Sequence, residues 1–91
     1  MNIIANSEYF LNVYKVENLL LDNYDNMRED LAMLISTTLV SAIYYNNEFN
    51  SYTWVVEQAI AVISLSGERL PDGINKLLIA NPINTIIIEE D

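Results

Sequence analysis

Residues 31–67 read LAMLISTTLVSAIYYNNEFNSYTWVVEQAIAVISLSG, and their only charged side chains are those of Glu48 and Glu57. The run is interrupted at residues 46–50, where Asn-Asn-Glu-Phe-Asn combines residues that favour turns. A helix that is apolar on nearly every side is usually buried. We therefore predict that two helices, one on each side of this break, form a central apolar hairpin around which the rest of the chain packs.

The sequence before residue 31 predicts one further helix and also the start of the first hairpin helix. An amphipathic helix is predicted from Ser7, its N-cap, to Tyr24, because apolar residues recur there at helical spacing. The members of this apolar stripe are Tyr9, Val13, Val16 and Leu20. Asn26, followed three residues later by Glu29, resembles a capping box. It predicts the start of the first hairpin helix, which continues to Tyr45.

The half of the hairpin beyond the break has its own boundary signals. Ser51 can accept a hydrogen bond from the first turn of a helix, and Gly67 can take the left-handed conformation that often follows a helix end. We predict a helix between these two residues. Alternating positions in this segment also suit a strand, so a strand remains the alternative for residues 53–66.

Shorter elements are predicted near the C-terminus. A turn is expected at residues 71–73, with Asp72 as the cap of a short helix over residues 74–80. Residues 83–88 have the composition of a strand. Because a lone strand leaves its backbone groups unpaired, we expect it to pair with residues 3–4.

Length and composition agree with one small domain. Ninety-one residues suit a single domain, and a hydrophobic content of 52 % is too high for a disordered acidic chain. The predicted fold is mainly α: one acidic helical domain over residues 1–91, built as a bundle of three to four helices around the apolar hairpin. An α+β fold that contains the short terminal pairing is the alternative.

The residue inventory excludes most catalytic and metal-binding chemistry. The chain has no histidine and no cysteine, which removes imidazole bases, thiolate nucleophiles, disulfides and the common zinc sites. Its two glycines, Gly67 and Gly73, lie in no phosphate-binding motif. The acidic run at residues 22–33 lacks the glycine and the final glutamate of a calcium loop. We predict no catalytic residue, no metal ligand and no cofactor, and hence a protein that is not an enzyme.

Charge and hydropathy also indicate where the protein acts. Four basic and thirteen acidic residues give a net charge of −9, which disfavours direct contact with nucleic acid. The uncharged run at residues 31–45 is shorter than the roughly 20 residues of a membrane-spanning helix. Residues 1–6 lack the basic start and long apolar segment of a secretory signal. We expect a cytoplasmic protein that inserts into no membrane.

The candidate contact residues fall into two groups. Acidic residues concentrate in the first thirty positions and at the last three, and these two clusters would form one negative face if the termini approach each other. The predicted partner-binding residues are Asp22, Tyr24, Asp25, Glu29, Asp30, Glu89, Glu90 and Asp91. Aromatic residues surround the central break and are candidate interface anchors. These are Tyr44, Tyr45, Phe49, Tyr52 and Trp54.

These features predict a small, non-catalytic acidic binding protein that inhibits or neutralises a protein partner. Its negative face would occupy a basic surface of that partner, often one that binds nucleic acid, and so act partly as a nucleic-acid mimic. Size, charge and the missing catalytic residues place it in one class with phage-encoded anti-CRISPR and anti-restriction inhibitors of host nucleases, and with antitoxins and immunity proteins. A phage-encoded, viral protein of this kind would act in the host cytoplasm.

Two other interpretations follow from the same composition. The chain has more apolar residues than a small core needs, which predicts a homodimer or a higher homo-oligomer. The protein would then be a structural or adaptor subunit whose acidic surface only keeps the assembly in solution. A third, weaker interpretation is a protein that sequesters a small molecule in a pocket between helices or at a dimer seam.

Overall fold

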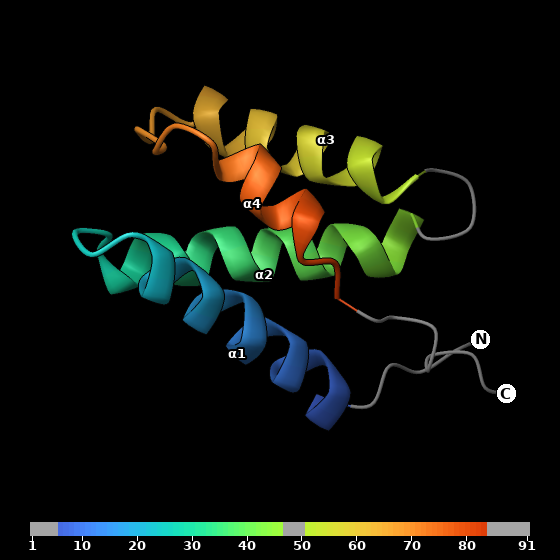
Figure 1. Cartoon of the computed structure of the whole chain (residues 1–91). Coiled ribbons are helices and arrows are strands. Elements are labelled where there is room, and N and C mark those ends of the chain that lie inside the picture. The colour runs from blue at the N-terminus through green and yellow to red at the C-terminus, as the bar shows by residue number, and fades with distance from the viewer. Residues whose placement is uncertain (1–5, 47–50, 84–91) are drawn as a thin grey trace, which may run out of the picture.

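The fold is seen in a computed structural model, which describes residues 6–46 and 51–83 (Figure 1). Those residues form four helices and no strand, as predicted for a mainly α bundle. The helices are α1 (Asn6–Asn23), α2 (Glu29–Asn46), α3 (Tyr52–Leu65) and α4 (Ile74–Ala80). Residues 53–66 are therefore helical up to Leu65, and the strand alternative is wrong there. The predicted pairing of residues 83–88 with residues 3–4 lies outside the described residues except for Ile83, which is not in a strand.

Helix α2 is the centre of the bundle (Figure 1). It packs against α1 on one side and α3 on the other, while α4 packs against α3. The buried apolar residues of the four helices form one core. They are Val13, Val16, Leu20, Leu31, Ala32, Ile35, Leu39, Val40, Ile43, Val55, Val56, Ala59, Ile60, Ile63, Ile74 and Leu78. The predicted central hairpin is thus confirmed as α2 and α3.

Two hydrogen bonds fix the position of α1 on α2. The amide of Asn12, which is only 3 % exposed, donates from Nδ2 to Oη of Tyr44 over 3.0 Å. The hydroxyl groups of Tyr9 and Ser41 lie 3.0 Å apart. Because a buried polar group without a partner is costly, these bonds favour one register of α1 over its alternatives.

The boundaries of α3 follow the local sequence rules. The side chain of Ser51 accepts a hydrogen bond from the backbone N–H of Trp54 over 3.1 Å, so that Ser51 is the N-cap as predicted. At the other end Gly67 has φ = 95°, a conformation that L side chains rarely adopt. Its N–H donates to the carbonyl of Ser64 over 3.0 Å. The predicted N-cap and the predicted stop are both confirmed.

Other predicted caps are wrong by one to three residues. Helix α1 begins at Asn6, which places Ser7 inside the helix, and it ends at Asn23. Helix α2 begins only at Glu29, because the N–H of Met27 first closes a turn onto the carbonyl of Tyr24 over 3.1 Å. Asn26 therefore lies in the connection and forms no capping box.

The cap of α4 is also different from the prediction. Gly73, with φ = 81°, is the N-cap residue, and no side chain caps this helix. The carbonyl of Gly73 accepts from the N–H of Leu77 over 3.0 Å. Asp72 precedes the cap, so its carboxylate is not used as we expected and stays exposed.

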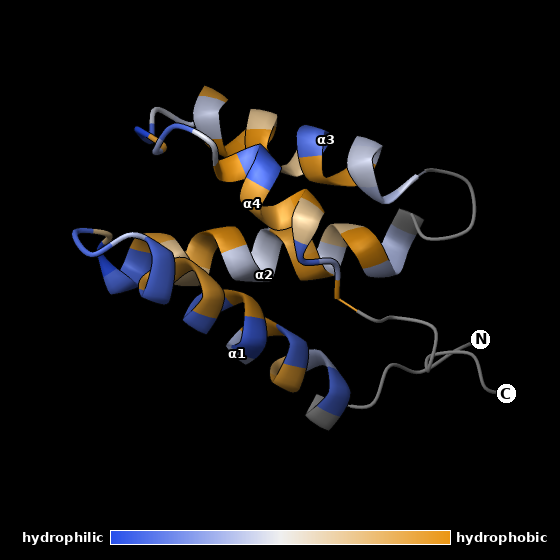
Figure 2. Ribbon diagram, viewed as in Figure 1, coloured by the Kyte–Doolittle hydropathy of each residue, from blue (hydrophilic) through white to orange (hydrophobic). Residues whose placement is uncertain are grey.

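Helix α3 is less buried than its composition predicts. Its inner face contributes to the core, but Trp54, Val62 and Leu65 remain 42 %, 58 % and 87 % exposed. The short α4 and the central α2 cover only one side of α3. Figure 2 shows hydrophilic residues gathered on α1 and the connection after it, whereas α2 and α3 are mostly apolar or neutral. In the part of the chain that the structure describes, no helix is long and apolar enough to cross a membrane.

Candidate functional site

Two connections that are far apart in the sequence meet at one end of the bundle (Figure 1). One joins α1 to α2, and the other joins α3 to α4. The hydroxyl of Tyr24 donates to the backbone carbonyl of Asp72 over 3.4 Å. The guanidinium of Arg28 lies 3.3 Å from the carboxylate of Glu68. These contacts span 48 and 40 residues of sequence, so they bring the two connections into one surface.

Carboxylates gather on this surface, which we call the acidic end. It comprises Asp22, Asp25, Glu29, Asp30, Glu68 and Asp72. The first four were predicted from the sequence as partner-binding residues, together with Tyr24. Tyr24 and Asp25 line a pocket between the two connections, Asp30 pairs with Arg28, and Asp22 and Glu29 lie at the adjoining ends of α1 and α2. Glu68 and Asp72 were missed, because only the fold places the α3–α4 connection beside the α1–α2 connection. The turn at residues 71–73 was recognisable, but its acidic residue was assigned to helix capping.

Arg28 orders two of the six carboxylates. Its Nε lies 2.9 Å from Oδ1 of Asp30, and its Nη2 reaches Glu68 on the other connection. The hydrogen bond to Asp30 is the main cause that raises the pKa of Arg28, and the same bond from Arg28 lowers the pKa of Asp30. All of these groups are substantially accessible to water, which screens the interaction. The ion pairs therefore orient side chains more than they stabilise the fold.

The other four carboxylates are available for contact. Asp22, Asp25, Glu29 and Asp72 are exposed, and none of the ion pairs within residues 6–46 and 51–83 involves them. Arg69 is the second cation at this end and is exposed as well. Six carboxylates against two guanidinium groups leave the acidic end with a local charge of −4.

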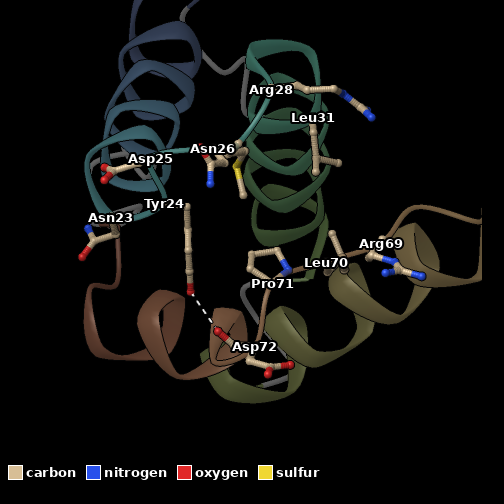
Figure 3. A pocket seen from close by; sticks show the side chains of 11 residues that line it. Asn23, Tyr24, Asp25, Asn26, Arg28, Leu31, Arg69, Leu70, Pro71 and Asp72 are labelled. Atoms are coloured by element: carbon tan, nitrogen blue, oxygen red, sulfur yellow. Dashed lines mark hydrogen bonds between the residues drawn. The ribbon is translucent and has the colours of Figure 1, made fainter.

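An open pocket of about 790 Å³ lies between the two connections (Figure 3). Met27, Leu31, Leu70 and Pro71 provide its apolar surface, and asparagine, aspartate and arginine side chains surround them. Figure 3 shows Tyr24 extending from the first connection towards the backbone of Asp72. The acidic end can therefore receive an apolar side chain as well as positive charges.

Two of the predicted aromatic anchors make contacts between helices of the bundle. Tyr44 contacts Tyr9 of α1, with ring centroids 6.0 Å apart, and belongs to the α1–α2 interface. Tyr52 donates to the carbonyl of Leu78 over 3.2 Å and joins α3 to α4. Phe49 lies outside the described residues. Tyr44 and Tyr52 thus join helices within the bundle, and the role of the five aromatic residues as interface anchors stays a prediction.

The remaining two predicted anchors are accessible. Tyr45 is 87 % exposed and Trp54 is 42 % exposed, each on a different helix. Burial raises the pKa of Tyr44 and of Tyr52 above that of a free tyrosine, whereas the amide of Asn12 beside Tyr44 and the backbone of Ile83 beside Tyr52 act in the opposite direction. The hydrogen bonds of Tyr44 and Tyr52 thus join helices within the bundle, and Tyr45 and Trp54 are the two of the five predicted anchors that are described as exposed.

The other predicted site residues cannot be placed. Glu89, Glu90 and Asp91 lie outside the described residues, so the predicted merging of the two acidic clusters stays a prediction. Within the described ranges, no group of three or more carboxylates is arranged so that it could hold a metal ion.

Comparison of the chain with protein-family models, with curated proteins and with solved structures finds no match. The acidic end combines carboxylates that form no ion pair within the described part of the chain, two arginines and a partly apolar pocket, a combination suited to contact with another macromolecule.

Proposed function

We propose that this protein is a non-catalytic binding protein whose acidic end occupies a basic surface of another protein and thereby inhibits or neutralises it. The observation that carries the proposal is the meeting of the two connections, which gathers six carboxylates on one surface; four of them have no ion-pair partner among residues 6–46 and 51–83. Exposed charges of one sign attract a surface of the opposite sign over a range of about 10 Å at 0.1 M salt.

Two features of the acidic end support the proposal that it binds a partner, and does not only keep the protein in solution. Arg28 pairs with the carboxylates of Asp30 and Glu68, so that two acidic residues from different connections lie beside one guanidinium group. The lining of the pocket between the two connections includes the apolar residues Leu31 and Leu70. Binding at such a surface combines electrostatic attraction with burial of an apolar side chain. The burial supplies affinity that salt does not screen.

Inhibition requires only that a functional surface be covered, and no catalytic group is needed for that. We place the protein with small acidic inhibitors of nucleic-acid enzymes, such as phage-encoded inhibitors of defence nucleases, and with antitoxins and immunity proteins. A basic, nucleic-acid-binding surface is the natural target, because the acidic end presents negative charge where a phosphate backbone would. Such a partner would place the protein in the cytoplasm, which is the host cytoplasm for a phage-encoded chain.

A capture experiment tests this proposal. The protein is immobilised through its N-terminus and exposed to a lysate of the cells that produce it, at about 0.05 M and about 0.5 M NaCl. We expect a basic protein to bind at the lower salt concentration, to be released at the higher one, and to lose its activity when the purified protein is added. Capture of acidic proteins only, or of a basic protein whose activity is unchanged, would contradict the proposal.

The pocket favours a second candidate function, the binding of a small molecule. Its volume of about 790 Å³ falls within the roughly 300–1,000 Å³ of known ligand sites, although it opens widely to solvent. Native mass spectrometry separates the two candidates. A bound compound of constant mass that is lost in Leu70→Asp would favour this second function, and a ligand-free mass would favour protein binding.

A further inference from the structure

The pocket between the two connections has an apolar lining that is open to solvent. Met27, Leu70 and Pro71 line it and are each half-buried, and Leu31, which also lines it, is 7 % exposed. Apolar surface gains free energy when another apolar group excludes water from it. The lining therefore favours an occupant that brings at least one large apolar side chain.

Charged side chains around the pocket determine which other groups such an occupant carries. Asp25 and Asp72 line the pocket and are exposed, and they form no ion pair within the described part of the chain. Arg28 lines it as well, but its guanidinium is engaged with Asp30 and Glu68. Two carboxylates beside an apolar lining complement a segment that carries basic residues next to an apolar one.

The charges of opposite sign are not mixed evenly around the pocket. Figure 3 shows Asp25 on one side of the pocket and both Arg28 and Arg69 on the other. Since like charges repel, the basic residues of an occupant are expected to lie towards Asp25 and Asp72 and away from the two arginines. The pocket therefore uses two particular carboxylates of the acidic end, and the other four contribute only at longer range.

We propose that this pocket binds a segment of the partner protein in which one large apolar side chain, such as that of leucine, is flanked by lysine or arginine. The apolar side chain contacts the lining that includes Leu70, and the basic side chains pair with Asp25 and Asp72. This inference rests on the proposed function, because it names the part of the basic partner that the acidic end recognises. It adds that a basic surface without an apolar residue binds only weakly.

Fluorescence anisotropy with two labelled peptides tests the proposal. In the leucine peptide one leucine stands between two runs of three lysines, and in the serine peptide a serine replaces it, so that both carry the same charge. We expect the leucine peptide to bind about tenfold more tightly at about 0.1 M NaCl, because only its side chain gains from apolar burial. Between about 0.05 M and 0.5 M NaCl both affinities should fall while their ratio stays nearly constant, since salt does not screen apolar burial.

Two leucine variants show whether the pocket is the place of binding. Leu70 and Leu77 are both half-buried, but only Leu70 lines the pocket. Leu70→Ala should weaken binding of the leucine peptide about fivefold and leave the serine peptide nearly unchanged, because only the leucine side chain contacts the lining. Leu77→Ala is the matched control and should change the affinity of neither peptide. Far-UV circular dichroism checks that both variants are folded.

Two pairs of charge variants test the position of the basic residues. Asp25→Asn with Asp72→Asn removes the two carboxylates that line the pocket, whereas Asp22→Asn with Glu29→Gln removes two that belong to the acidic end but do not line it. Both pairs change the net charge equally. We expect the first pair to weaken binding of both peptides at least about threefold more than the second, because the closer charges interact more strongly.

Failure of this inference is distinguishable from failure of the proposed function. Equal affinities of the leucine and serine peptides, or equal effects of Leu70→Ala and Leu77→Ala, would overturn the inference. The proposed function would stand if a basic protein is nevertheless captured from the lysate and inhibited. Failed capture together with a preserved preference for the leucine peptide would overturn the proposed function alone. Tighter binding of hexylamine than of the leucine peptide would assign the pocket to a small amine and would equally overturn the inference.

Discussion

The centre of the bundle and its acidic end are built on different principles. Around α2, side chains such as Leu39 and Ile35 are fully buried, and the buried amide of Asn12 has a hydrogen-bond partner. At the acidic end, two connections are joined by a tyrosine hydroxyl and an arginine, and four of the carboxylates are exposed without an ion pair among the described residues. The centre therefore determines stability, whereas the acidic end can change its charges at little cost to the fold.

The largest effect is expected from a cavity in the centre. Leu39 is fully buried on α2, so Leu39→Ala should lower the free energy of unfolding by about 2–5 kcal/mol. The same change at Leu65, which is 87 % exposed, should alter it by less than about 0.5 kcal/mol at micromolar protein concentration. Urea denaturation followed by far-UV circular dichroism measures both. Equal losses in the two variants would mean that α2 is not the centre of the core.

The next effect concerns the buried hydrogen bond between α1 and α2. Asn12→Ala should lower the free energy of unfolding by about 1–2 kcal/mol, because the bond to Tyr44 and part of the packing are lost. Tyr44→Phe removes the same bond from the other side. The double variant should lose less than the two single variants together. Strict additivity of the two losses would show that the bond does not couple the helices.

A smaller effect on the free energy of unfolding is expected from helix capping, because Ser51 caps α3 whereas Asp72 does not cap α4. Ser51→Ala should lower the free energy of unfolding by about 1 kcal/mol, since the N–H of Trp54 loses its acceptor. Asp72→Ala should have almost no effect, because Gly73 is the N-cap of α4. A loss of about 1 kcal/mol in Asp72→Ala would restore Asp72 as the cap that its sequence position suggested.

A pH effect of similar or smaller size is expected from Tyr52. Burial raises its pKa above that of an unfolded tyrosine, so the folded state favours the neutral hydroxyl. The buried hydroxyl of Tyr52 makes its full contribution to the free energy of unfolding below a pH of about 10. This contribution is lost as the pH rises through the pKa of Tyr52 in the folded state. The unfolding free energy of the wild type should thus fall more steeply above pH 10 than that of Tyr52→Phe. Parallel curves would show that the hydroxyl is not buried in solution.

Local rules explain which parts of this fold could be predicted from the sequence. Ser51 and Gly67 mark the ends of α3 because a side-chain acceptor and a left-handed residue act over one turn of the same helix. Asn26 and Asp72 failed as caps because competing local interactions, a turn at Tyr24 and a left-handed Gly73, determine where α2 and α4 begin. Residues 31–67 are apolar enough to indicate the central hairpin whatever the details of its ends.

The sequence was less informative about surfaces. The pairing of Tyr24 with Asp72 and of Arg28 with Glu68 depends on how α3 and α4 fold back on the bundle, which no local pattern encodes. For the same reason the exposed half of α3 was expected to be buried. The residue type of Leu65 does not indicate whether its side chain is buried in the core or exposed on the surface.

Two charge-matched variants test most directly the central claim that the acidic end binds a basic partner. Asp25→Asn, Glu29→Gln and Asp72→Asn together remove three negative charges from the acidic end, whereas Glu8→Gln, Glu17→Gln and Glu57→Gln remove three from other surfaces. The affinity of each variant for the captured partner is measured at about 0.1 M NaCl. The account predicts that the first variant binds about tenfold or more weakly and shows less salt dependence, while the second binds nearly as the wild type does. Equal losses in the two variants would contradict it, because only the overall charge would then matter.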